Sequence, residues 1–182
     1  MISLAKYRMI LDKDTGNFYV KSEEYSICPI CDSPELKVIG SRKRRALHGN
    51  GEAIMLIIRR LRCSNCHRIH HELPNMLVPY KRYTSTVIES ILDDAGTEVC
   101  CENSSIYRIK RWFAEASEYM AGCLTAIAAR LGLETKVRSY PACQRIIDLV
   151  GEGIGWLGRT VRTMVNKNLW LHTRSAFLSS WD

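Results

Sequence analysis

Cys28-Pro-Ile-Cys31 and Cys63-Ser-Asn-Cys66 bracket the stretch of sequence that decides the fold. A Cys-x-x-Cys turn presents two sulfurs to one ion, and Zn²⁺ prefers four tetrahedral ligands, of which thiolates are among the best. The 31 residues between the pairs suit a zinc ribbon, in which a β-hairpin separates two cysteine turns. We therefore expect Cys28, Cys31, Cys63 and Cys66 to hold a structural Zn²⁺, whose complete shell leaves no open position for chemistry. Buried free thiols are the alternative, and no βαβ pattern supports a redox pair.

A β-hairpin is the predicted structure between the two cysteine pairs. Leu36–Leu47 and Glu52–Arg62 are similar in length, and an Asn-Gly pair in the segment that joins them is a strong hairpin signal. A smaller hairpin is expected nearer the start, where Tyr7–Leu11 and Phe18–Val20 flank a loop of turn-forming residues.

Positive charge is concentrated in the predicted ribbon. The chain has 182 residues with 26 Lys+Arg, 19 Asp+Glu and a net charge of +7, and residues 37–72 hold nine basic and two acidic residues, which is also +7. Phosphate contacts from such a ribbon supply affinity without sequence choice, so it predicts a nucleic-acid partner. The candidate contacts there are Arg42, Lys43, Arg44, Arg45, Arg59, Arg60, Arg62 and Arg68. A solvated face that serves only solubility is the alternative.

The composition is that of a globular protein. The residues are 46% hydrophobic and 25% charged, which excludes disordered, collagen-like and coiled-coil compositions. The longest aliphatic run, Ala53–Ile58, is far shorter than the ~20 apolar residues of a membrane span. Because no basic-then-apolar leader opens the chain, we expect no membrane partner and a cytoplasmic, nucleoid-associated protein. In that reducing compartment, paired cysteines more often bind metal than form disulfides.

The second half of the chain has helical patterns. Helices are expected over about Thr84–Asp94, from Asn103–Ser105 to Gly132, over Pro141–Gly151 and over Trp156–Leu169. The first two, with a short element at Thr97–Glu102 between them, have helix–turn–helix spacing, in which the last helix enters the major groove of DNA. Its candidate contacts are Ser104, Ser105, Tyr107, Arg108, Lys110 and Arg111. A plain helical core with a basic exposed face is the alternative.

The expected fold class is α+β. Residues 1–72 form an N-terminal β-hairpin and a zinc ribbon with four cysteine ligands, and residues 73–182 form an all-α helix–turn–helix and helical C-terminal region. The long helix has an apolar seam from Ile106 to Leu131 at near-heptad steps. Packing inside one chain is the commoner use of such a seam, and a homodimer is the alternative.

The chain resembles the N-terminal zinc ribbon of insertion-sequence transposases at Cys28-Pro-Ile-Cys31 and over the stretch from Arg59-Arg-Leu-Arg62 through the second cysteine turn to His70. The chain is more similar still to a family of small bacterial zinc-ribbon and helix–turn–helix proteins, mainly from Firmicutes, linked to mobile elements. Further residues that carry this similarity are Leu73-Pro74, Pro79-Tyr80, Ser104–Ile106, Arg111–Phe113 and Trp170–Leu178. The resemblance implies DNA binding in transposition or its regulation, and it brings no established activity with it. His67 stands where Gly is common in such turns.

No catalytic constellation is visible in the sequence. After Trp112 only 70 residues remain, and their helical patterns hold no set of carboxylates that would gather two metal ions. Since a Gly-rich phosphate loop and a nucleophile elbow are also missing, we expect no enzyme activity. The leading hypothesis is a protein that binds double-stranded DNA, either as a mobile-element accessory factor with a transposase as candidate partner or as a transcriptional regulator. The alternative is an adaptor whose ribbon docks on a transposase or RNA polymerase.

The sequence does not determine the roles of two further groups of residues. His67, His70 and His71 follow the last metal ligand, where they either contact metal or phosphate or lie on the surface. The other cysteines lack metal-type spacing and are expected in the core or half-buried. They are Cys100, Cys101, Cys123 and Cys143.

Overall fold

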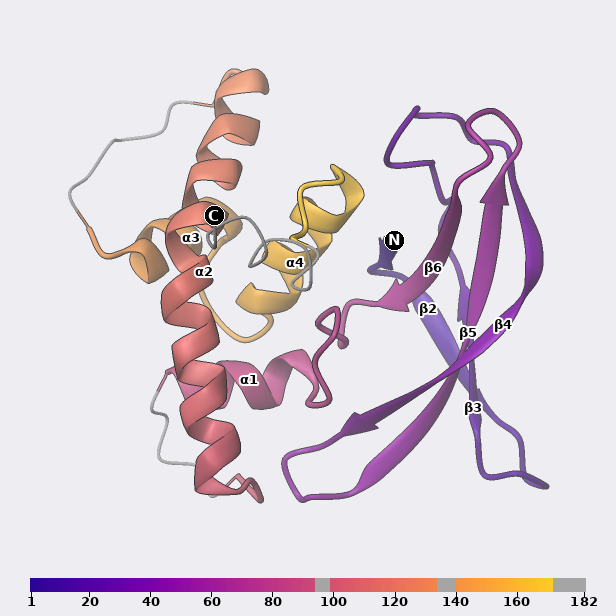
Figure 1. Cartoon of the computed structure of the whole chain (residues 1–182), viewed down its shortest axis with the longest axis horizontal. Coiled ribbons are helices and arrows are strands. Elements are labelled where there is room, and N and C mark those ends of the chain that lie inside the picture. Colours follow the sequence, from indigo (N-terminus) through magenta and orange to yellow (C-terminus); the bar gives the residue numbers. More distant parts are fainter. Residues whose placement is uncertain (94–98, 134–139, 172–182) are drawn as a thin grey trace, which may run out of the picture.

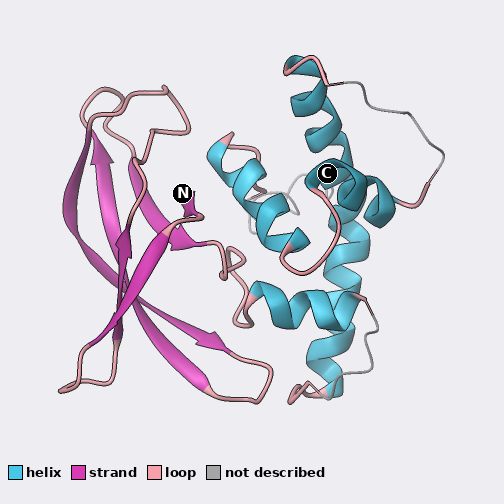
Figure 2. Ribbon diagram, turned by 180° about the vertical axis from the view of Figure 1, so that it is seen from behind, coloured by secondary structure: helices cyan, strands magenta, loops and turns pink. Residues whose placement is uncertain are grey.

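Six strands and four helices make up the described part of the chain (Figure 1). The computed structural model describes residues 1–93, 99–133 and 140–171. The strands are β1 (Ile2–Leu4), β2 (Tyr7–Leu11), β3 (Phe18–Ser22), β4 (Leu36–Leu47), β5 (Ala53–Cys63) and β6 (Ile69–Pro74). The helices are α1 (Ser85–Leu92), α2 (Asn103–Arg130), α3 (Ala142–Val150) and α4 (Trp156–Asn166). The strands lie on one side of the molecule and the helices on the other (Figures 1 and 2).

β5 is the centre of the sheet. β4 runs antiparallel along its whole length, from Leu36 opposite Cys63 to Leu47 opposite Ala53. The other edge of β5 is shared by β6, which is antiparallel near the C-terminal end, and by β3, which is parallel near the middle. β1 extends the sheet beyond β6, and β2 extends it beyond β3. The six strands together form a curled half-barrel (Figure 2).

The predicted fold class, a hairpin and a zinc ribbon followed by an all-α helix–turn–helix, is wrong. The two hairpins belong to one sheet, because β3 pairs with β5 at Phe18 and Leu56. Residues 99–102 form no helix between α1 and α2, and the first residues of that predicted element lie outside the described part of the chain. Instead, the N–H of Cys100 donates to the C=O of Gly49 in the β4–β5 turn, at 2.9 Å. Pairing between strands far apart in the chain depends on tertiary packing, which local spacing does not reveal.

The sheet and the helices each have a hydrophobic core. Leu56, Ile58 and Leu61 of β5 pack with apolar residues of β1, β3 and β6. In the helical core, residues of all four helices meet, and Trp156 and Trp170 are buried there. The chain thus combines a sheet layer with a helical cluster.

Hydrogen bonds join these two parts. The side chain of Asn166 in α4 accepts from the N–H of Ser3 in β1 at 2.7 Å and donates to the C=O of Ser3 at 3.0 Å, as a neighbouring strand would. Arg162 of α4 donates to the carboxylate of Glu24 at 3.0 Å. α4 is therefore the helix that contacts the edge of the sheet at β1.

β6 crosses the position at which the sequence predicts a domain boundary, between residues 72 and 73. The division into two domains stays a prediction. None of the described helices has the length and apolar character that crossing a membrane requires.

Candidate metal centre and basic surface

The two Cys-x-x-Cys turns have the same backbone geometry. In each, the residue after the second cysteine has a positive φ, which is 54° at Asp32 and 57° at His67. Its N–H donates to the C=O of the first cysteine, at 2.9 Å in the first turn and 3.1 Å in the second. The N–H of the first cysteine in turn donates to the C=O two residues beyond the second, at 2.9 and 3.0 Å. The turn therefore forms with His67 in the left-handed conformation that Gly adopts most readily.

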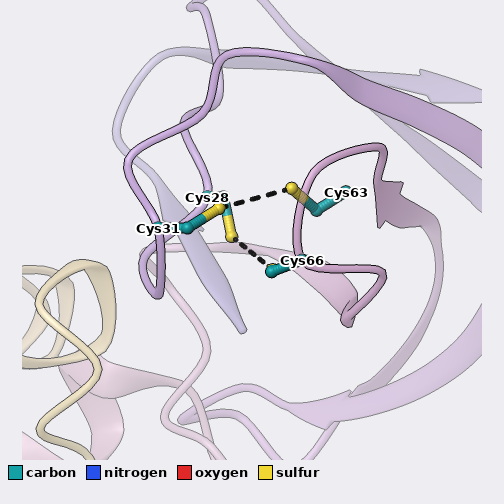
Figure 3. A group of neighbouring side chains, drawn as sticks. All are labelled: Cys28, Cys31, Cys63 and Cys66. Atoms are coloured by element: carbon teal, nitrogen blue, oxygen red, sulfur yellow. Dashed lines mark hydrogen bonds between the residues drawn. The ribbon is translucent and has the colours of Figure 1, made fainter.

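The four cysteine sulfurs meet between these turns (Figure 3). All four Sγ atoms lie within 4.8 Å of one another, with 3.5 Å between those of Cys28 and Cys66 and 3.6 Å between those of Cys31 and Cys63. A tetrahedral ion with metal–sulfur bonds of about 2.3 Å needs sulfur–sulfur distances of about 3.8 Å, so the donor set fits a metal ion. The predicted gathering of the four cysteines is confirmed, and the identity of the metal stays a prediction.

Burial and backbone dipoles act in opposite directions on two of the thiols. Burial raises the pKa of Cys28 to about 12. Backbone N–H groups, above all that of Cys66, lower the pKa of Cys63 to about 6. A cation held by the four sulfurs would favour the thiolate at both positions, since metal binding releases thiol protons.

Of the three histidines, His70 reaches the metal centre. It is 2% exposed, and its Nε2 lies 3.3 Å from Sγ of Cys28. Burial lowers the pKa of His70 to about 4, so the imidazole is neutral and can donate one N–H to a thiolate. His67 is exposed, whereas His71 is half-buried beside Arg42.

One predicted nucleic-acid contact, Arg59, forms an ion pair within the protein. Arg59 donates to the buried carboxylate of Glu72, at 2.6 Å from Nε and 3.1 Å from Nη2, and Ser26 donates to the same carboxylate at 2.7 Å. The sequence alone does not reveal this pair, because no local pattern identifies a carboxylate on a neighbouring strand as the partner of Arg59. Arg59 therefore stabilises the sheet.

The other ribbon cations form no ion pair with any described residue. They are Lys37, Arg42, Lys43, Arg44, Arg45, Arg60, Arg62 and Arg68. On β4 they divide between two faces. Arg42 lies opposite Ile58 of the sheet core, and Arg44 shares that face. Lys43 and Arg45 alternate with them and point to the opposite face.

The start of α2 lies beside the end of the ribbon. A groove of about 620 Å³ has lining residues from the end of β4, from the Tyr80–Tyr83 segment and from the first turns of α2. Of the predicted contacts on α2, Ser105 is half-buried, and the others are exposed. Two of the exposed ones have partners on α2 itself: Arg108 donates to Oγ of Ser105 at 3.3 Å, and Arg111 pairs with Glu115 at 2.8 Å.

Residues 28–112 match the model of a family described as a domain of unknown function (DUF6431). The match covers both cysteine turns, the ribbon and the start of α2, so the metal centre and both groups of candidate contacts lie within it. Neither a curated protein nor a solved structure matches the chain.

Proposed function

We propose that this chain is a DNA-binding protein whose sheet is held by a structural Zn²⁺ at Cys28, Cys31, Cys63 and Cys66. One observation carries the proposal of DNA binding: eight of the nine ribbon cations form no ion pair with a described residue, and the exception is Arg59. Zn²⁺ is the metal to expect at four thiolates in tetrahedral geometry.

The charge of the ribbon exceeds what protection of a sheet edge requires. β4 is an edge strand, and isolated charged side chains are enough to blunt such an edge. Here Arg42, Lys43, Arg44 and Arg45 follow one another on β4. Like charges on neighbouring positions of a sheet repel each other, so a bound polyanion would stabilise this arrangement. A duplex supplies regularly spaced phosphates and gains affinity by releasing its own counterions.

The groove beside the ribbon extends this surface toward α2. Its described lining includes the cations Lys81, Arg82 and Arg108 and a single carboxylate, that of Glu102. Backbone N–H groups at a helix start also favour phosphate. We therefore assign phosphate contacts to the first turns of α2 as well as to the ribbon.

The resemblance to mobile-element proteins supports a role in transposition or transcription. The chain would act as an accessory factor beside a transposase, or as a regulator, without catalysis of its own. In either role the Zn²⁺ holds the fold, because a complete shell of thiolates leaves no coordination position for a substrate.

Salt-dependent DNA binding tests the proposal. In fluorescence anisotropy with a labelled duplex, Lys43→Gln/Arg45→Gln should weaken binding and reduce the slope of log K against log salt by about 2, since each lost phosphate contact removes about 0.9. The matched control is Lys13→Gln/Lys21→Gln, which removes the same charge from exposed positions on the β2–β3 hairpin. A wild type that does not bind duplex DNA, or equal losses in both variants, would contradict the proposal.

One observation favours an adaptor as a second candidate, with strand β2 and not the ribbon as its docking surface. β2 is the last strand at its end of the sheet, and Met9, Ile10 and Leu11 on it are 42%, 49% and 50% exposed. A free strand edge with exposed apolar side chains is a surface on which a protein strand can add. An adaptor would keep its partner at high salt, whereas the DNA complex would dissociate.

A further inference from the structure

A cationic cavity lies where the ribbon, the second cysteine turn and the segment before α1 meet. Its volume is about 360 Å³. Arg42 and Arg44 of β4, Arg68 of the cysteine turn and His71 of β6 line it, and Tyr80 lies on its rim with half of its surface exposed. Apolar residues, among them Ile58 and Leu73, supply the rest of the wall.

No carboxylate lines this cavity among the described residues. Arg44 is half-buried, and its Nε has no hydrogen-bond partner there. Burial and the neighbouring guanidinium of Arg42 lower the pKa of Arg44, and burial, Arg42 and Arg60 lower the pKa of His71. Cations packed against one another in a partly apolar cavity repel each other more strongly than in water. The lining therefore favours a bound anion.

We propose that this cavity binds a phosphate group, and that the phosphate is one of the DNA backbone, which rests on the function proposed above. Guanidinium groups match a phosphate with paired N–H donors, and Arg42 and Arg44 share one face of β4. Partial exclusion of water by Ile58 and Leu73 strengthens each such bond. His71, as a neutral imidazole, can donate one further N–H.

The path that a DNA backbone would take across the surface supports the same assignment. Tyr80 lines both this cavity and the groove that leads to Arg82 and Arg108 at the start of α2. A strand with one phosphate in the cavity would thus have its neighbouring phosphates over the groove. The ribbon then contributes two different contacts: a seated phosphate at Arg42 and Arg44, and surface contacts from the opposite face of β4.

Titration calorimetry of the zinc-loaded 182-residue chain with inorganic phosphate tests the cavity. Arg42→Gln/Arg44→Gln should weaken phosphate binding about tenfold or more, since each lost hydrogen bond to a charged group is worth that much. Lys13→Gln/Lys21→Gln is the control, because it removes the same number of positive charges from exposed positions on the β2–β3 hairpin, and it should change phosphate affinity less than about twofold. Phosphate should also raise the unfolding temperature of the wild type and of the control, but not that of Arg42→Gln/Arg44→Gln.

The outcomes separate this proposal from the function on which it rests. Phosphate binding that depends on Arg42 and Arg44 and is displaced by duplex DNA supports it. Absence of phosphate binding, or equal loss in both double variants, overturns the cavity assignment even if the protein binds DNA. Phosphate binding that DNA does not displace overturns the assignment to the DNA backbone and leaves a site for a free phosphate compound. Failure of the wild type to bind DNA overturns the proposed function, and calorimetry still reports on the cavity.

Discussion

At the residue scale, we expect the contact of His70 with Cys28 to determine how firmly a metal ion is held. Nε2 of this buried imidazole lies 3.3 Å from Sγ of Cys28, a residue that, like Cys63, has no exposed surface. A group that donates to a metal ligand orients it and tunes its basicity, and loss of such a group costs about 10–100-fold in metal affinity.

We therefore expect His70→Phe, which keeps a ring of similar bulk but removes the N–H, to weaken Zn²⁺ binding by about 10–100-fold. Competition with a chromophoric chelator measures the affinity. His67→Gly is the control, because it removes an exposed imidazole at a backbone position with a φ of 57° that Gly favours. A His70→Phe protein that binds Zn²⁺ as tightly as the wild type would show that His70 only fills space.

At this scale, the sequence identifies the residues whose chemistry is encoded in short spacing. Two Cys-x-x-Cys turns predict a common site because each turn presents two sulfurs by itself. His70 and Glu72 are different, since their roles depend on the pairing of β5 with β6. Arg59 is an example. From the sequence it is predicted to contact nucleic acid like the other cations of the ribbon, and only the structure shows that it forms an ion pair with Glu72 instead.

At the scale of the elements, a buried carboxylate joins two helices. Glu89 of α1 is 4% exposed and accepts from the N–H of Gly155 at 2.7 Å and of Leu157 at 2.8 Å, at the start of α4. These are N–H groups that a helix start leaves without a partner inside the helix. Burial raises the pKa of Glu89, and the same N–H groups act against that rise. The carboxylate thus caps α4 from a neighbouring helix.

Glu89→Ala should lower the free energy of unfolding by about 1–3 kcal/mol, because it leaves buried N–H donors without an acceptor. Urea unfolding followed by circular dichroism at a constant Zn²⁺ concentration measures the change. Glu115→Ala is the matched control, since its i,i+4 pair with Arg111 is exposed and such pairs contribute about 0.5 kcal/mol or less. Equal stability of the two variants would mean that α4 does not depend on this cap.

The sequence predicts the position of each helix more accurately than the face it buries. α2 begins at Asn103, within the predicted start. Its predicted seam follows Ile106 to Leu131 at near-heptad steps, whereas Leu124 and Ala128 are buried and Leu131 is 68% exposed. A straight helix of 3.6 residues per turn drifts away from a 3.5-residue repeat, so the second half of the seam lies one residue later than predicted. Contacts with α1, α3 and α4 determine which face of α2 is buried. The spacing of apolar residues along α2 carries no information about those contacts.

At the scale of the whole molecule, β5 connects features that the sequence treats separately. It carries the candidate ligand Cys63, pairs along its length with the basic strand β4, and brings the N-terminal hairpin into the same sheet through β3. Short-range patterns reveal hairpins, because their strands are close in the chain, but parallel pairs such as β3–β5 and β1–β6 join distant segments. This is why the ribbon and its cysteines are predictable, whereas the half-barrel is not.

The same connection determines what metal removal should do. The first pair of the β4–β5 ladder is Leu36 with the candidate ligand Cys63, and β6 begins directly after the second cysteine turn. Zn²⁺ binding to cysteine turns contributes about 10–16 kcal/mol to folding in small zinc domains. The helical core has its own buried residues, among them Phe113, Met120 and Leu124 of α2, and none of them contributes a metal ligand.

Chelation should therefore release about one Zn²⁺ per chain, measured by elemental mass spectrometry, and unfold the sheet more than the helices. In hydrogen exchange, amides of β4, β5 and β6 should lose protection first, because their ladder ends at the metal centre. Amides of α2 between residues 109 and 128 should stay protected, since apolar packing holds them. Restored protection on adding Zn²⁺ is the control. Retained protection in the metal-free sheet would remove the structural role of the metal, and simultaneous loss in α2 would show that the sheet and the helices unfold as one cooperative unit.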